Sequence, residues 1–462
     1  MKLLSSELYG NSPIYLQNLL LSFREYANSR KRYGMGYYRF LHQLSIMDER
    51  DPLAEQAFQD QELQALVQHA ALHSPFYREL YRNKASEIQT AADLTLLPVI
   101  TETLFEERIQ EIHTQAQSKK EASTHNAAAG ISLLQLTNLD IQKQTAAVDH
   151  FRKQNGAINL EMKRATIYSG DFVPHTQTEG AFWRDIYYLN QRLYSAQHCR
   201  EPFLEPVVRN LNEFRPDFID GLPSAILALS RFINTHRIIL TFQTAAVFVE
   251  TEILTDTERL EIESAFGCTV RRWSMASDRS PFLYECASGN LHFNMRTGVL
   301  EFAERGKVLL TLFHTRGTPL IRLEIKDRLL PVPCPCACGS AHPVVRRPAV
   351  PESEYLQSKS RGKVTSLYLA TVQEKFRALA PAMQFVQDSL DEIIIWIDGD
   401  APLPFDSEQQ IRQEMVQVFG ADMRFTVRSR EVEQVDLAES SGLIINNLNL
   451  NKRICPRECG ME

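Results

Sequence analysis

The 462-residue sequence predicts an α/β protein with a large N-terminal α/β domain and a small C-terminal α+β domain. A single hydrophobic core rarely supports a chain of this length, and 44% hydrophobic residues supply ample core for two domains. Helical and strand patterns alternate in the middle of the chain, and a strand, helix and strand follow near its end. The net charge of -7 offers no basic footprint for nucleic acid, so nucleic acid is not an expected partner.

The N-terminal region is expected to be helical. Between Asp60 and Leu72, apolar residues recur with the i, i+3, i+4, i+7 spacing of an amphipathic helix, at Leu63, Leu66, Val67 and Ala70. Pro75 follows closely, and a helix usually ends before a proline. The sequence therefore predicts a helix over residues 60–72.

The middle of the chain shows the α/β alternation. A helical pattern over Pro223–Ile233 is followed by the β-branched and aromatic run Ile238–Val249, which is typical of a buried strand. Further strand patterns, separated by Gly and Asn turn residues, cover Leu291–Phe293, Val299–Phe302 and Val308–Phe313.

A second domain is expected beyond a linker, because residues 345–363 are rich in Arg, Pro, Ser and Glu and have no periodicity. The predicted divisions are residues 1–345, a linker at 346–363, a small domain at 364–440 and a loose tail at 441–462. Within the small domain, Ile393–Ile397 predicts a strand, and Ser407 with Gln410 predicts a capping box. The helix face (Ile411, Met415, Phe419), Gly420 and the alternating Met423, Phe425 and Val427 complete a β-α-β unit.

Two pairs of soft ligands predict a metal site. Five residues separate Cys286 from His292, and Cys336-Ala-Cys338 precedes Gly339. Thiolates and a neutral imidazole suit tetrahedral Zn²⁺, and a closed four-ligand site is structural. The alternative is that these cysteines are small buried hydrophobes and His292 an ordinary sheet histidine. Cys455 and Cys459 offer only two ligands for a second metal.

The compartment is predicted from the cysteines and the N-terminus. Eight cysteines in so long a chain, crowded around Cys336, favour metal ligation in a reducing compartment over a disulfide framework. Residues 1–7 lack the apolar core of a signal peptide, and no run approaches the length of a membrane span. A cytoplasmic protein without a membrane span is expected.

Several segments in order resemble the phenylacetate:CoA ligase family of adenylate-forming enzymes, and more closely its CapK-like branch. They lie at residues 73–81 (HSPFYRELY), 93–101 (DLTLLPVIT), 214–224 (FRPDFIDGLPS), 252–267 and 319–327 (PLIRLEIKD). The resemblance implies a large and a small domain, with ATP converting a carboxylate to an acyl-adenylate and coenzyme A then accepting the acyl group. Some members carry Cys, His and Cys-x-Cys-Gly where this chain does, which makes Cys334 a spectator.

The motifs that bind ATP in the resembled family are altered here. The SSGTTG-type phosphate loop corresponds to residues 122–130 (ASTHNAAAG), which keep Ser123 and Thr124 but lose the inner glycines that form an anion nest. The YGxxE motif falls on residues 274–278 (SMASD), where only the acid Asp278 remains, with Trp273 as an alternative aromatic wall. The lysine of the family's SGK motif is replaced by Leu443.

Other nucleotide-site remnants are implied by the same resemblance. The RYxTGD segment corresponds to residues 322–327 (RLEIKD), which keep Arg322 and the ribose-binding Asp327, and the GRxDD hinge keeps at most Arg347. Binding of ATP, Mg²⁺ and CoA is therefore doubtful, and no residue is assigned a catalytic role.

Three functions stay open. The first is a diverged ligase-like protein, defective in adenylation, that binds or transfers an acyl or aryl carboxylate or thioester, with an acyl carrier or pathway enzyme as partner. The second is a non-catalytic scaffold in a biosynthetic pathway. The third is an active ligase with an atypical phosphate loop.

Overall fold

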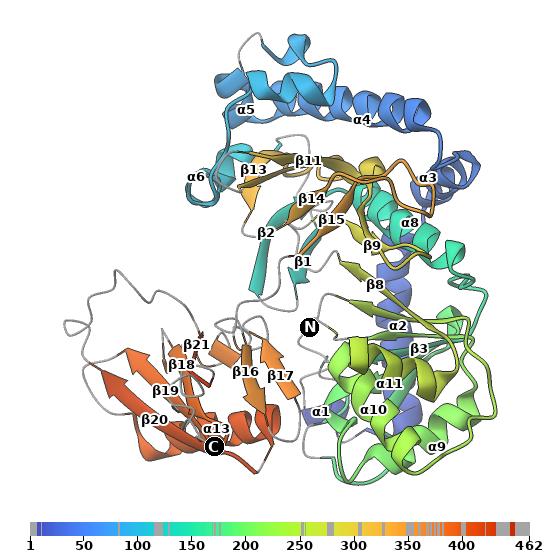
Figure 1. Ribbon diagram of the computed structural model, residues 1–462, viewed down its shortest axis with the longest axis vertical. Coiled ribbons are helices and arrows are strands. Elements are labelled where there is room, and N and C mark those ends of the chain that lie inside the picture. Colours follow the sequence, from blue (N-terminus) through green and yellow to red (C-terminus); the bar gives the residue numbers. More distant parts are fainter. Residues whose placement is uncertain are drawn as a thin grey trace, which may run out of the picture. The chain divides into compact units, whose positions relative to one another are not determined.

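The chain forms two compact units, residues 1–125 with 132–346 and residues 126–131 with 347–462. A computed structural model (Figure 1) describes residues 7–10, 12–81, 84–114, 123–127, 130–168, 170, 172–174, 177–250, 254, 256–274, 281–303, 307–325, 329–347, 355–358, 362–365, 369, 372–373, 376, 379–380, 383–398, 403–420, 422–430 and 444–448. Within these ranges, no helix has both the length and the apolar character needed to cross a bilayer.

The first unit begins with helices, in order α1 (Glu7–Gly10), α2 (Ile14–Arg32), α3 (Met35–Ile46), α4 (Pro52–His73), α5 (Pro75–Tyr81), η1 (Lys84–Glu87), η2 (Ala91–Leu96), α6 (Glu102–Glu107) and α7 (Ile109–Ile112). The helix predicted over residues 60–72 is confirmed as part of α4, and its apolar face is buried. It begins earlier than predicted because the Asp51 side chain accepts hydrogen bonds from the backbone N–H groups of Leu53 and Ala54.

The central sheet of the first unit has ten strands in the order β14-β15-β10-β9-β8-β7-β6-β3-β5-β4. Strands β5, β3, β6, β7 and β8 are parallel to one another, and the pairings at both ends of the sheet are antiparallel. The strands are β3 (Arg164–Tyr168), β4 (Trp183–Ile186), β5 (Gln191–Ser195), β6 (Phe218–Gly221), β7 (Ala246–Glu250), β8 (Thr269–Ser274), β9 (Leu283–Glu285), β10 (Leu291–Phe293), β14 (Leu330–Val332) and β15 (Val344–Arg346).

Helices cover both faces of the parallel strands, as expected for a buried parallel sheet. One face packs against α9 (Leu204–Phe214), α10 (Pro223–Thr235) and α11 (Asp256–Phe266), and the other against α8 (Asn138–Gln154), α2 and α3 (Figure 1). Gly221 ends β6 with φ of 141°, where a Cβ would lie 2.2 Å from the carbonyl oxygen of Ile167. Only glycine fits this close contact between β6 and β3.

The α/β alternation predicted for the middle of the chain is confirmed, with one correction. Helix α10 covers the predicted range, but the strand predicted over residues 238–249 begins only at Ala246. The apolar residues before it lie in a loop. Three of them, Ile238, Leu240 and Phe242, pack against the core that contains α10. Burial at the edge of a core thus produced an apolar run that is not a strand.

A smaller antiparallel sheet contains β11 (Gly298–Phe302), β12 (Val308–Leu312) and β13 (Leu320–Ile325), which confirms the strands predicted in this region. Its apolar side chains share a core with helices α4 to α7. Strands β1 (Ser123–Ala127) and β2 (Gly130–Leu136) form a separate two-stranded sheet. Short 3-10 helices are η3 (Tyr187–Leu189), η4 (Ala196–His198) and η5 (Met295–Thr297).

The second unit contains the predicted β-α-β motif. Strands β19 (Glu392–Asp398) and β20 (Arg424–Arg430) are parallel and joined through α13 (Phe405–Phe419), whose Ile411, Met415 and Phe419 are buried. The predicted capping box is wrong: α13 begins at Phe405 after Pro404, with no side-chain cap, and Ser407 lies within its first turn. The fixed φ of proline starts this helix instead.

Two segments outside the predicted small domain belong to its fold. Strand β16 (Tyr355–Ser358), expected in the linker, pairs with β17 (Gly362–Thr365), and its Leu356 is fully buried. Strand β21 (Ile444–Asn446), expected in the tail, pairs in parallel with β18 (Met383–Ser389) in the sheet β20-β19-β18-β21. Both strands are too short to give a periodic pattern. Cys455 and Cys459 lie outside the described residues.

Candidate metal centre

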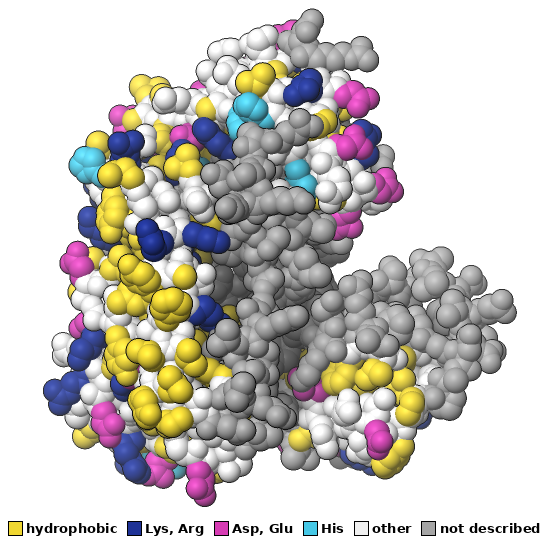
Figure 2. All heavy atoms as spheres, turned by 180° about the vertical axis from the view of Figure 1, so that it is seen from behind, with side chains coloured by type: hydrophobic (Ala, Val, Ile, Leu, Met, Phe, Trp, Pro, Cys, Tyr) yellow, Lys and Arg dark blue, Asp and Glu magenta, His cyan; other side chains and the backbone are white. Residues whose placement is uncertain are grey.

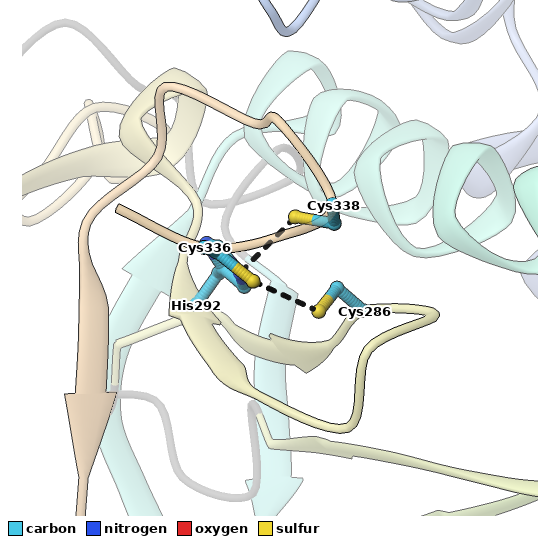
Figure 3. Close-up of side chains that lie close together, drawn as sticks. All are labelled: Cys286, His292, Cys336 and Cys338. Carbon is cyan, nitrogen blue, oxygen red and sulfur yellow. Dashed lines mark hydrogen bonds between the residues drawn. The ribbon is translucent and has the colours of Figure 1, made fainter. Parts of the chain in front are cut away.

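Two loops of the first unit bring the predicted ligands together. Cys286 follows β9 and His292 lies on β10, so the β9–β10 hairpin contributes one pair of ligands. Cys336 and Cys338 lie in the loop between β14 and β15, and β15 pairs with β10. Figure 3 shows the four side chains converging from these two loops. The sheet register therefore holds the two pairs side by side.

The spacing of the four ligand atoms fits a tetrahedral metal ion. The sulfur atoms of Cys286 and Cys336 are 3.7 Å apart, and Cys338 Sγ lies 3.5 Å from His292 Nε2. A tetrahedron with Zn–S of about 2.3 Å and Zn–N of about 2.0 Å has edges of about 3.8 Å between sulfurs and about 3.5 Å between sulfur and nitrogen. All four ligand atoms lie within 4.8 Å of one another, so these residues could hold a metal ion.

A hydrogen bond on the side of the ring away from the cysteines fixes the orientation of His292. Its Nδ1 lies 2.8 Å from the backbone carbonyl oxygen of His342, which can only accept a hydrogen bond. The proton therefore resides on Nδ1, and the lone pair of Nε2 faces the three sulfur atoms. Ligating histidines at metal sites commonly donate their other ring N–H to a backbone carbonyl, which sets the tautomer in this way.

The thiols are electrostatically coupled. Burial opposes ionisation of Cys336, but hydrogen bonds from the Cys338 backbone and the Asn290 amide lower the pKa of its thiol to about 6. Burial and the neighbouring sulfur atoms of Cys336 and Cys286 raise the pKa of Cys338 to about 12. A divalent cation at the cluster would favour the thiolate form of its cysteines. Cys334 is exposed and is not part of the cluster.

A buried ionic network ties the metal loop to α4. Glu55 accepts hydrogen bonds from Arg296 at 2.5 to 3.0 Å and lies 2.9 Å from Nε2 of His342. The Nδ1 of His342 meets the Tyr284 hydroxyl at 2.8 Å. None of these side chains was predicted from sequence. A signal was present, because Glu55 and Gln59 continue the buried face of α4 at helical spacing, where polar residues need partners.

Replacing Glu55 with Gln is expected to destabilise the first unit by about 3 kcal/mol, because it removes the close carboxylate partner of the buried Arg296 and leaves only Glu49, at 3.7 Å. Hydrogen bonds and charges from His342 and Arg296 lower the Glu55 pKa although burial raises it. The wild-type advantage is therefore full above the ordinary glutamate pKa and is lost as the pH falls through the lowered folded-state value. Urea unfolding at neutral and acidic pH measures both effects.

The matched control is Glu205→Gln, since Glu205 pairs with Arg209 on the surface of α9 with both side chains about two-thirds exposed. Its expected effect is below about 0.5 kcal/mol. Equal destabilisation by the two variants would contradict a structural role for the network.

The chain is similar to known proteins in its C-terminal part and along most of its length. Residues 356–447 match the family described as the CapK C-terminal domain. Protein CapK of Staphylococcus aureus is 30% identical over 398 aligned positions, and the match covers 84% of this chain and 87% of CapK. The chain belongs to the CapK family. The predicted membership in the CapK-like branch of adenylate-forming proteins is therefore confirmed.

The fold is that of adenylate-forming CoA ligases. A structure of 2-hydroxyisobutyryl-CoA ligase in complex with 2-HIB-AMP and CoA, in the thioesterification state, superposes with a TM-score of 0.56 and 16% identity, covering 87% of this chain and 92% of the ligase. The same ligase in the postadenylation state, with R3-HIB-AMP, gives 0.51 and 14% identity over 86% and 90% of the two chains. At these identities the similarity concerns the fold.

In this CapK-family chain, the described residues that were predicted as nucleotide-site remnants lie on different elements. Arg322, on β13, donates hydrogen bonds from Nε and Nη2 to Glu301 at 2.9 to 3.2 Å and from Nη1 to the carbonyl oxygen of Leu97. Ser123 and Thr124 lie on β1, and Arg347 directly follows β15. Asp278, Asp327 and Leu443 lie outside the described residues.

Another ionic cluster, missed from sequence, involves the 214–224 segment of the resemblance. Asp220 on β6 is buried and accepts hydrogen bonds from Arg152, Arg164 and Thr166. Burial raises its pKa, but the two guanidinium groups lower it further, so the net shift is downward. Trp273, at the end of β8, stacks over Arg152 at 5.7 Å from the ring centroid. These contacts give Asp220 and Trp273 structural partners within the sheet.

Proposed function

We propose that this CapK-family protein binds an acyl or aryl carboxylate, or its thioester, without carrying out ATP-dependent adenylation itself. The observation that supports this most is the conformation of the segment corresponding to the family's phosphate loop. Residues 123–127 form strand β1, which pairs with β2.

A β-strand is poorly suited to binding a phosphate group. A phosphate nest needs successive backbone N–H groups that converge on one point, which requires residues in left-handed or helical conformations. In a β-strand successive N–H groups point to opposite sides. Every second N–H group donates its hydrogen bond to the paired strand and cannot bind phosphate. The chain also has Asn126 and Ala127 where the family has glycine-rich sequence, and alanine resists positive φ.

The cationic groups of the site are also missing or engaged. Arg322 already donates hydrogen bonds to the Glu301 carboxylate and to a backbone carbonyl, so its N–H donors are occupied without nucleotide. At the position of the family's catalytic lysine, Leu443 offers no charge for the α-phosphate. Loss of a single donor to a transition-state charge typically costs about 10²- to 10³-fold in rate.

The metal centre is proposed to hold zinc in a structural role. Three cysteines and one histidine are a common structural zinc set, and with four protein ligands no coordination position is left for water or substrate. The ion would fasten the loop after β14 to the β9–β10 hairpin and take no part in chemistry.

Titration calorimetry with a panel of aromatic and aliphatic acyl-CoAs, the corresponding carboxylates, free CoA and Mg-ATP tests the binding proposal. We expect micromolar binding of at least one acyl-CoA, weaker binding of free CoA because it lacks the acyl group, and no heat from Mg-ATP. Failure of every acyl-CoA and carboxylate to bind would contradict the proposal, and so would micromolar binding of Mg-ATP.

A further inference from the structure

Helix α2 carries an apolar stripe on its outer side. Tyr15, Leu19, Phe23 and Tyr26 follow one another at helical spacing and are 73%, 61%, 73% and 52% exposed. We call these four residues the α2 stripe. Scattered exposed apolar residues are ordinary, but a row along a single helix face marks an interaction surface.

The inner side of α2 is firmly seated, so the stripe is not an unpacked core face. Leu21 is fully buried, and the Asn18 side chain accepts a hydrogen bond from the backbone N–H of Asp185 on β4. Arg184 of the same strand donates from Nε to Gln17 at 2.6 Å. These contacts fix the rotation of the helix and leave the α2 stripe facing outward.

Neighbouring elements widen the surface. Tyr187 and Tyr188 of η3 are 60% and 38% exposed, and the ring of Tyr188 meets that of Tyr26 edge-on with centroids 5.7 Å apart. On α3, Met35 and Tyr38 are 67% and 55% exposed. Figure 2 shows the result as a long apolar strip over these helices, with Lys and Arg side chains beside it.

The charge around the strip is opposite in sign to that of the whole chain. From residue 12 to residue 47 there are five basic residues and one acid, a net +4, whereas the chain carries -7. The basic residues are Arg24, Arg30, Lys31, Arg32 and Arg39. The acid, Glu25, is largely buried and already paired with Arg24 and Arg32. Arg30 and Lys31 at the end of α2 are exposed.

We infer that this surface docks the protein onto an anionic membrane. Tyrosine side chains have an apolar ring and a polar tip, and they favour the boundary between lipid and water. Here tyrosines make up half of the α2 stripe and recur on η3 and α3. Basic residues beside exposed aromatic and aliphatic side chains are typical of helices that lie on anionic lipid.

The same charges disfavour a second copy of the chain as the occupant. A two-fold dimer through this surface would bring two copies of the same net-positive region together, which like-charge repulsion disfavours. The inference is independent of acyl binding, because none of these residues belongs to the metal centre or to the motifs of the nucleotide site.

Co-sedimentation of the full chain with vesicles tests the inference. We expect binding to vesicles of equal parts phosphatidylglycerol and phosphatidylcholine, little binding to phosphatidylcholine alone, and release by high salt. Phe23→Ser with Leu19→Ser is expected to weaken the partition at least about 10-fold through lost apolar burial. Arg30→Gln with Lys31→Gln should weaken it about 25-fold, at about 5-fold for each charge.

The matched control is Leu260→Ser, because Leu260 on α11 is 63% exposed and lies on the opposite side of the sheet. Its partition should equal that of the wild type. Wild-type protein that stays in the supernatant with both kinds of vesicle would overturn the inference. A wild-type dimer that Phe23→Ser converts to a monomer would overturn it as well, since the surface would then be buried between copies.

Discussion

Protein purified without chelator is expected to contain one zinc ion per chain, and Cys336→Ser is expected to lose it together with about 3 kcal/mol or more of stability. Binding at a structural zinc site is coupled to folding, so the free energy of coordination is part of the free energy of unfolding. Cys336 contributes the thiol with the lowered pKa, and its Sγ atom lies 3.7 Å from that of Cys286. Elemental analysis and urea unfolding measure the two effects.

Cys334→Ser is the matched control for this prediction. Cys334 lies in the same loop, yet it is exposed and stands apart from the four clustered ligands. The variant should keep its zinc and its stability. Because the ligands must be deprotonated, zinc affinity should also fall as the pH is lowered. Full zinc occupancy in Cys336→Ser, or a metal content near zero in the wild type, would contradict the zinc assignment.

The grouping of Cys286, His292, Cys336 and Cys338 could be predicted because ligand chemistry leaves a local signature in sequence. Each pair lies within a short loop, and soft ligands at short spacing have few other uses. The partners behind them could not be predicted in the same way. Glu55 and Arg296 are 241 residues apart and become neighbours only after α4 packs on the sheet.

The architecture was predictable where elements are long and periodic. Helix α4 and the β19-α13-β20 unit each bury one regular face, and their patterns survive in sequence. Strands β16 and β21 were missed because strands of a few residues are defined by the partners they pair with. The start of α13 was misplaced because Ser407 and Gln410 match a capping box, whereas the helix already begins at Phe405, directly after Pro404.

The proposed loss of adenylation has the largest expected effect on function. Adenylation concentrates negative charge on the α-phosphate in a site that excludes water, and it needs a phosphate nest, a divalent metal and a cation. This chain has strand β1 in place of the nest, Asp278 in place of the longer acid and Leu443 in place of the lysine. At about 10²- to 10³-fold for each missing contribution, the combined loss reaches the background rate. For the same reason, Leu443→Lys alone should restore no activity.

Carboxylate-dependent exchange of labelled pyrophosphate into ATP tests the central claim most directly, because it reports adenylation alone and requires neither CoA nor product release. The assay takes the zinc-loaded full chain with Mg-ATP and a panel of aromatic and aliphatic acids, and a 2-hydroxyisobutyryl-CoA ligase with its own acid serves as the positive control. The predicted result is exchange at background with every acid. Exchange well above background with any acid would contradict the account and establish the chain as an active ligase with an atypical phosphate loop.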